Sequence, residues 1–270
     1  MSNITFVSCF YIIKSKHPSS LYIQWMNNLI QIANKNQTKF NLVIFSNQES
    51  SIYININNSQ NIKVIIKPIE QLYGYNCKDY WIKNHKQNIL LNTKTDWKLN
   101  MIWCEKVWFV YETMLKKYFD TEYYGWCDIG YFRDGSENFN NWPNNSIINN
   151  LNKSKIVYAC VNNNKKIMEQ LFNLINNKNA KGLPNNQIPT NQVSIAGGFF
   201  MIHKSKIEWW ANTFIDTVIR YFENNYLIKD DQIILVDCIL SNYSHFNLST
   251  LITTNKINQH NWFMFQQLLK

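Results

Sequence analysis

The chain has 270 residues and a mass of 32.2 kDa, a length that fits one large domain or two closely fused ones. Hydrophobic residues make up 46% of it and glycine and proline are scarce, which excludes intrinsically disordered, collagen-like and linker-like chains. The net charge of +9 allows a nucleic-acid binder, but only two of the 27 basic residues are arginines and the lysines are scattered, so we expect no nucleic-acid partner.

The first part of the chain alternates strand-like and helical segments. Nearly continuous apolar runs rich in β-branched and aromatic residues predict buried strands at 4–13, 41–46 and 62–67. A helix is predicted at 20–34, where apolar residues recur near helical spacing after Pro18-Ser19-Ser20. This order is typical of the opening of an α/β fold, whereas residues 70–97 have no clear period and receive no assignment.

The second part continues the pattern. We predict helices at 99–118, 162–177, 204–225 and 230–242, strands at 123–130, 155–161 and 194–203, and loops at 134–153 and 178–192. A final strand and a short tail, NQHNWFMFQQLLK (258–270), close the chain. Without repeats or linkers, the sequence predicts a single α/β domain over residues 1–270, with a mixed, mostly parallel central sheet flanked by helices.

The cysteines and the termini bear on location. No Cys-x-x-Cys pair occurs, which argues against a zinc ribbon. Five cysteines lie inside apolar runs and are expected to be buried in a reducing compartment: Cys9, Cys104, Cys127, Cys160 and Cys238. No basic n-region precedes the first apolar stretch and no run reaches the length of a transmembrane helix. We therefore expect a soluble, cytoplasmic protein without a membrane span.

The first candidate site residue is Asp128, in the sequence WCDIG (126–130). It follows a predicted buried strand, and open α/β sheets bind ligands at such strand ends. A carboxylate there suits Mg²⁺ or Mn²⁺ held together with substrate phosphates. The alternative is a strand-end aspartate that only makes a turn, with Gly130 supplying the turn geometry.

Two further motifs follow in the second half. Gly197 and Gly198, in AGGFFMI, allow a close approach between backbone and ligand, or else mark a β-bulge. Asp230 and Asp231 begin a predicted helix, where Asp230 is expected to cap it and Asp231 to face a cleft as a base or as a stabiliser of positive charge. His260, in QHNW, is either a metal ligand beside carboxylates or an ordinary packed or surface histidine.

Taken in order, these motifs resemble those of glycosyltransferases with the GT-A fold, a Rossmann-like architecture. The stretches KLNMIWCEKVWFV and YYGWCDIGYFR are similar to the HtrL/YibB-like glycosyltransferase family. The pair GGFFMI and DDQ also resembles the glycosyltransferase domains of procollagen lysyl hydroxylases. The resemblance covers residues 98–134 and 195–235 closely and residues 4–262 loosely.

The resemblance implies a role for each matching residue. Asp128 matches the acid that holds Mn²⁺ or Mg²⁺ against the donor diphosphate, although Trp126 and Gly130 stand where the usual Asp-x-Asp motif has its other acid. His260 matches the late histidine that completes the metal shell. Asp231 matches the acid near the reacting centre.

The remaining matches concern the donor. Gly197 and Gly198 match the segment that lines the donor sugar and the acceptor, and Ser8 and Tyr11 lie where the nucleotide usually binds. Lys106 and Arg133 are cations that would stabilise phosphate charge.

We thus expect a metal-dependent glycosyltransferase that moves a sugar from a nucleotide sugar, a UDP-sugar foremost, to a glycan or protein acceptor. The missing second aspartate leaves open a catalytically inactive nucleotide- or sugar-binding module. The charge and the many aromatic residues leave open, less favourably, a basic nucleic-acid-binding protein. The tryptophan-rich stretches at 81–103 and 207–213 would permit a homodimer.

Overall fold

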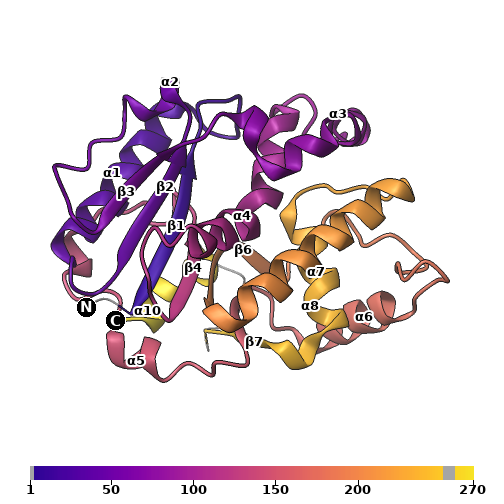
Figure 1. The fold of residues 1–270 in the computed structure, drawn as a ribbon. Coiled ribbons are helices and arrows are strands. Elements are labelled where there is room, and N and C mark those ends of the chain that lie inside the picture. Colours follow the sequence, from indigo (N-terminus) through magenta and orange to yellow (C-terminus); the bar gives the residue numbers. More distant parts are fainter. Residues whose placement is uncertain (1–2, 252–258) are drawn as a thin grey trace.

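The computed structural model describes residues 3–251 and 259–270, and the side chains of residues 259 and 260 lie outside that description. Figure 1 shows the arrangement of its elements. The strands are β1 (Ile4–Phe10), β2 (Asn41–Ser46), β3 (Ile62–Ile66), β4 (Tyr123–Cys127), β5 (Ile156–Cys160), β6 (Ile195–His203) and β7 (Phe246–Ser249).

The α-helices are α1 (Ser19–Lys35), α2 (Gln48–Ser51), α3 (Lys78–Gln87), α4 (Trp97–Leu115), α5 (Asn145–Asn149), α6 (Lys165–Asn176), α7 (Lys204–Glu223), α8 (Asp231–Ser241), α9 (Gln259–Trp262) and α10 (Phe265–Leu268). Short 3₁₀ helices are η1 (Ile69–Gln71), η2 (Tyr73–Cys77), η3 (Glu137–Phe139) and η4 (Tyr243–His245). Among the helices that the structure describes, none is long and apolar enough to cross a membrane.

The described strands form one seven-stranded sheet in the order β3-β2-β1-β4-β6-β5-β7. Four neighbouring pairs are parallel, and β6 runs antiparallel to both β4 and β5. The predicted fold class, an α/β fold with a mixed, mostly parallel sheet flanked by helices, is confirmed. That one domain spans residues 1–270 stays a prediction.

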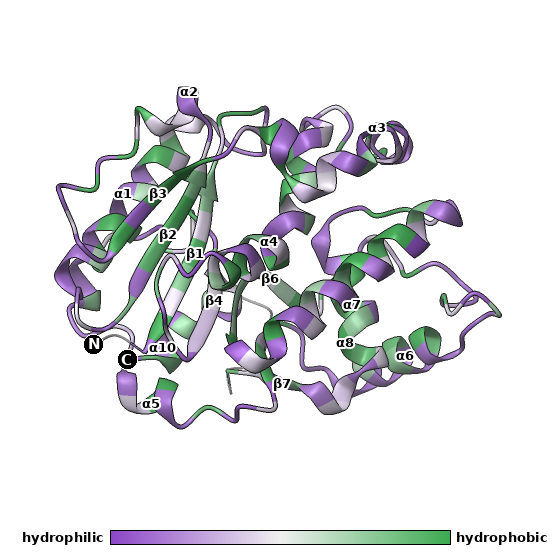
Figure 2. Cartoon of the chain, in the orientation of Figure 1, coloured by the Kyte–Doolittle hydropathy of each residue, from purple (hydrophilic) through white to green (hydrophobic). Residues whose placement is uncertain are grey.

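Both faces of the sheet are covered, and the strands read as almost wholly apolar for that reason. Along β1, Ile4 and Phe6 pack on the side of α1, whereas Val7 packs on the side of α4, α7 and α8. This alternation follows the two-residue period of a strand. In Figure 2 the central strands are largely green, while purple residues lie on the outer sides of the helices.

The topology opens a crevice between β1 and β4. The chain moves from β1 outward to β2 and β3, and then returns through α4 to place β4 on the other side of β1. The loops that follow β1 and β4 therefore diverge at their carboxyl ends, and such a switch point opens a crevice in α/β sheets.

Several boundaries differ from the sequence predictions. The predicted loop at 134–153 contains η3 and α5, and the unassigned stretch at 70–97 contains the end of η1, all of η2 and α3, and the first residue of α4. The tail is helical at α9 and α10, and the final strand lies earlier, at β7. Met264, Phe265 and Leu269 of the tail are buried in the core beside α1, so tertiary packing decides its structure.

The homodimer was expected from a tryptophan-rich surface at 81–103 and 207–213, and that premise is partly wrong. Trp81 and Trp210 are buried at 2% and 0% exposure, so they belong to the core and not to a tryptophan-rich surface. The prediction of buried cysteines holds for Cys104, Cys127, Cys160 and Cys238, whereas Cys9 is only half-buried because it lies at the carboxyl end of β1, beside the ligand site.

Candidate functional site

A cavity of about 610 Å³ lies at the switch point. Its walls come from the end of β1 and the segment that follows it, from α4, from the turn after β4, from β6, from the start of α8 and from α9 with the residue after it. Ligand pockets for small molecules and cofactors have volumes of roughly 300–1,000 Å³. The cavity therefore has the size and the position of a substrate site.

Most of the residues singled out in the sequence line this cavity: Tyr11, Lys106, Asp128, Arg133, Gly197, Gly198 and Asp231. Ser8 does not, because its side chain is fully buried within β1 and faces no pocket. The His260 side chain lies outside the described residues. Another histidine, His203 at the end of β6, caps α7 and pairs with Glu122, away from the cavity.

Asp128 begins a tight turn directly after β4. Its backbone N–H donates to Gly198 O at 2.8 Å, and Tyr131 N–H donates back to Asp128 O at 2.8 Å. Strand β4 thus ends at Cys127, three residues earlier than the sequence predicted. The Trp126 indole N–H donates to Asp128 Oδ1 at 2.5 Å. The tryptophan at the position where an Asp-x-Asp motif would have an acid therefore orients the remaining aspartate.

Lys106 lies at the floor of the cavity and joins three elements. Its side chain, on α4, is 9% exposed, and its Nζ lies 3.1 Å from Asp128 Oδ1 and 3.0 Å from Asp231 Oδ2. It also donates to Gly197 O at 3.0 Å. One ammonium thus holds two carboxylates that belong to the β4 turn and to α8.

Burial and the neighbouring charges shift the pKa values of Lys106 and Asp128. Burial alone would lower the pKa of Lys106, but Asp128 and Asp231 outweigh it and raise that pKa. Enclosure by the cavity walls raises the pKa of Asp128, against the opposing effects of Lys106 and Trp126. Lys106 is therefore a permanent cation, and the cluster of one ammonium and two carboxylates carries a net charge of about −1 when both acids are ionised.

Gly197 and Gly198 lie so close to the carboxylates of Asp231 and Asp128 that a side chain at either position would crowd them. A Cβ at Gly197 would lie 2.2 Å from Asp231 Oδ2, and one at Gly198 would lie 3.1 Å from Asp128 Oδ2. The pair thus admits the two carboxylates, whereas the close approach of a ligand stays a prediction. The alternative of a β-bulge has some support, because the register between β5 and β6 shifts between Ala196 and Phe200.

Asp230 and Asp231 differ in what their side chains contact. The Asp230 side chain accepts a hydrogen bond from Gln232 N–H at 3.2 Å and caps α8, while its other oxygen pairs with Lys229 at 3.0 Å. Burial and the neighbouring Asp231 raise the pKa of Asp230. Asp231 lies in the first helical turn, and its carboxylate is left for Lys106 and the cavity.

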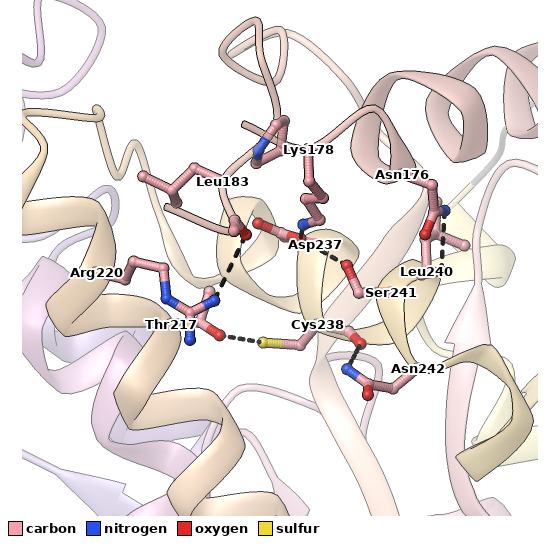
Figure 3. A network of polar contacts seen from close by, with 12 residues as sticks. Asn176, Lys178, Leu183, Thr217, Arg220, Asp237, Cys238, Leu240, Ser241 and Asn242 are labelled. Carbon is pink, nitrogen blue, oxygen red and sulfur yellow. Dashed lines mark hydrogen bonds and ion pairs between the residues drawn. The ribbon is translucent and has the colours of Figure 1, made fainter. Parts of the chain in front are cut away.

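A polar network farther along α8 holds this helix in place (Figure 3). Asp237 is 3% exposed and receives hydrogen bonds from Tyr221 of α7 and Ser241 of α8, and it pairs with Lys178 from the segment after α6. The Cys238 thiol contacts Thr217 of α7 at 3.3 Å. Because α8 also presents Asp231, this network fixes the orientation of the helix toward the cavity.

Sequence reasoning missed the aromatic rings that lie against the cations of the cavity. Arg133 Cζ lies 4.4 Å from the centre of the Trp25 ring and 5.0 Å from that of Phe263. Lys16 Nζ lies 4.7 Å from the ring centre of Trp103. These contacts join residues up to 130 positions apart, so no local pattern announces them.

The residues fit a divalent ion to a limited extent. Asp128 is 40% exposed, and neither a hydrogen bond nor an ion pair within residues 3–251 and 261–270 uses its Oδ2. A carboxylate oxygen completed by substrate phosphates is a ligand set that Mg²⁺ and Mn²⁺ accept. The described residues contain no group of three or more His, Cys, Asp or Glu side chains able to hold a metal ion by themselves.

Comparison with known proteins gives structural likeness only. No family model and no curated protein matches the sequence, so the HtrL/YibB-like resemblance stays an expectation. A galactosyltransferase, LgtC, solved in complex with donor and acceptor sugar analogs, is 8% identical, with a TM-score of 0.47 over 91% of this chain and 73% of that one. An active-site mutant of LgtC is 10% identical, with a TM-score of 0.47 over 91% of this chain and 72% of that one.

A glycosyltransferase involved in glycosylating the major capsid of PBCV-1 is 12% identical, with a TM-score of 0.40 over 92% of this chain and 82% of that one. Identities and scores this low do not transfer a function. The proposal below therefore depends on the residues of the cavity.

Proposed function

We propose that the protein is a glycosyltransferase that takes a sugar from a nucleotide-sugar donor, a UDP-sugar foremost, and passes it to a glycan or protein acceptor. The observation that carries the proposal is the convergence of Asp128, Asp231 and Lys106 on one cavity at the switch point of the sheet. The residues come from three separate segments and meet where α/β folds bind ligands.

The chemistry needs groups of the kind that this cavity holds. In the reaction, an acceptor hydroxyl oxygen bonds to the anomeric carbon, the bond from that carbon to the diphosphate oxygen breaks, and the hydroxyl proton goes to a base. Positive charge develops on the sugar, and a nearby carboxylate stabilises it or takes the proton. We assign this role to Asp231, since it lines the cavity and Lys106 holds it in place.

We further propose that Asp128 is the protein ligand of a Mn²⁺ or Mg²⁺ ion. Its exposed carboxylate supports this assignment, and the donor diphosphate and His260 would complete the shell. Such an ion, when bound, stabilises negative charge on the leaving diphosphate. The chain's own contribution is to orient Asp128 through Trp126 and Lys106.

Thermal unfolding against a panel of nucleotide sugars, with and without Mn²⁺, tests the proposal on wild type and Asp128→Ala. A ligand that binds only the native state raises the midpoint by mass action. We expect one donor to raise the wild-type midpoint in a Mn²⁺-dependent way and the variant to lose that dependence. If no nucleotide sugar shifts the wild type, the proposal is wrong.

A further inference from the structure

Three cations line the cavity, Lys16, Lys106 and Arg133, and the two that the sequence singled out, Lys106 and Arg133, differ in what remains available for a substrate. An ammonium group has three N–H donors. The Lys106 ammonium already contacts three oxygens at 3.0–3.1 Å, those of Asp128, Asp231 and Gly197. One contact is a hydrogen bond to Gly197 O and the other two are ion pairs, so two carboxylates already engage its charge and its role is to position them.

The Arg133 guanidinium differs from the Lys106 ammonium in how its donors are used. Its Nε donates to Gly130 O at 3.1 Å, and within the described part of the chain neither Nη group makes a hydrogen bond or an ion pair. The four Nη N–H groups therefore remain free for an anion. A guanidinium is suited to this because its planar fork matches the oxygens of phosphates and carboxylates.

The surroundings of Arg133 hold the guanidinium rigidly at the cavity wall. The ring of Trp25, itself 7% exposed, lies on one side, and Phe263 makes a second stacking contact. The turn that carries Arg133 is tied to α1, because Asn28 Nδ2 donates to Phe132 O at 2.8 Å. A stacked, tethered guanidinium loses little conformational entropy when it binds an anion.

The carboxylates at the cavity floor favour a cation at its wall for binding an anionic substrate. Asp128 and Asp231 outnumber Lys106, and Asp230 is matched by Lys229. When both acids are ionised, a diphosphate entering the cavity would meet net negative charge at the floor, with Lys16 and Arg133 as the cations of the wall. The choice of residue is also unusual for this chain, because lysine fills all but two of its 27 basic positions.

We propose that Arg133 is the residue that binds the diphosphate of the donor, and that Lys106 is a positioning residue without direct contact to it. This inference rests on the proposed function. The sequence assigned the stabilisation of phosphate charge to both cations, and the structure separates them into a diphosphate ligand and a positioning residue. The Nη groups of Arg133 would donate to non-bridging phosphate oxygens, and Asp128 would hold the metal ion that offsets the remaining phosphate charge.

Isothermal titration calorimetry in saturating Mn²⁺ tests the assignment. The probes are UDP, GDP, CDP and ADP, followed by the parent nucleoside of the diphosphate that binds wild type most tightly. The variants are Arg133→Gln, Arg133→Lys and, as a matched control that also loses one arginine charge, Arg220→Gln. Arg220 contacts Gly182 O and does not line the cavity.

We expect Arg133→Gln to weaken diphosphate binding at least tenfold and nucleoside binding less than twofold. Arg133→Lys keeps the charge but loses the fork, so it should recover only part of the loss, and Arg220→Gln should bind like wild type. If both Arg133 variants bind the diphosphate within twofold of wild type, or lose nucleoside and diphosphate equally, the assignment is wrong while the proposed function stands. If wild type binds none of the four diphosphates, both fail.

Discussion

Replacing Gly197 with alanine tests whether the glycine pair is there to admit the carboxylates. The new Cβ would lie 2.2 Å from Asp231 Oδ2 and 2.9 Å from its Cγ. The oxygen is 1.2 Å closer than the 3.4 Å at which ordinary van der Waals contact begins. The Asp231 side chain cannot rotate away freely, because Lys106 pairs with it and Leu235 also lies 3.1 Å from the new Cβ.

The expected cost follows from this overlap. Overpacking of a well-packed site costs about 1–3 kcal/mol of stability. If Asp231 has the proposed catalytic role, displacing its carboxylate by about 1 Å would also slow turnover by about 100-fold. The matched control is Gly198→Ala, whose Cβ would lie 3.1 Å from the more exposed Asp128 carboxylate, at a cost below about 1 kcal/mol.

Urea unfolding of both variants gives the stabilities, and the rate of nucleoside diphosphate release gives the turnover. We expect Gly197→Ala to be clearly less stable and slower than Gly198→Ala. Equal stability and equal turnover of the two variants would refute the reasoning that links the glycine to Asp231.

Three further predictions concern the buried charged residues Glu105 and Lys106 of α4 and Asp237 of α8. Burial raises the pKa of Glu105 from 4.5 to about 7, so the folded state binds its proton more tightly than the unfolded chain does. Stability should therefore fall by on the order of 3 kcal/mol as pH rises from 4.5 through 7 and then level off. Urea unfolding across pH should show this slope in wild type, and a slope that persists in Glu105→Gln would contradict the role given to Glu105. Asp237→Asn leaves Lys178 without its buried partner and should cost about 3 kcal/mol in the same assay, and a change below about 0.5 kcal/mol would show that the network does not hold α8. Lys106→Met leaves two carboxylates facing each other and should cost about 3–5 kcal/mol, of which a second change, Asp231→Asn, recovers a part; additive losses in the double variant would speak against the ion-paired cluster.

Much of the fold could be predicted because its signals are local. The buried strands are continuous apolar runs, and the helices have apolar residues at regular spacing. The cap of α8 was predictable for the same reason, since Asp230 bonds to an N–H only two residues away. Where structure depends on distant packing, as in the tail around Phe265, local patterns pointed to the wrong element.

The residues of the candidate site also divide into those that a local pattern indicates and those that only distant contacts bring together. Asp128 stood out because it directly follows a buried strand, and Asp231 because Asp230 already supplies the cap of α8. The role of Lys106 could not be read from the sequence, because its three oxygen partners lie 22 to 125 positions further along the chain. Ser8 was placed at the nucleotide by analogy, but the two-residue period of β1 and the packing around it leave Ser8 fully buried.

Donor turnover tests the central claim most directly. The donor that stabilises the wild type in the thermal panel should be incubated with wild type and with Asp231→Asn, with and without candidate glycan acceptors, while release of the nucleoside diphosphate is measured. We predict release by the wild type and a rate at least ~100-fold lower in the variant, with donor binding retained. Donor binding without release in any condition, or equal release by both proteins, would contradict the assignment of this cavity as a glycosyltransferase site.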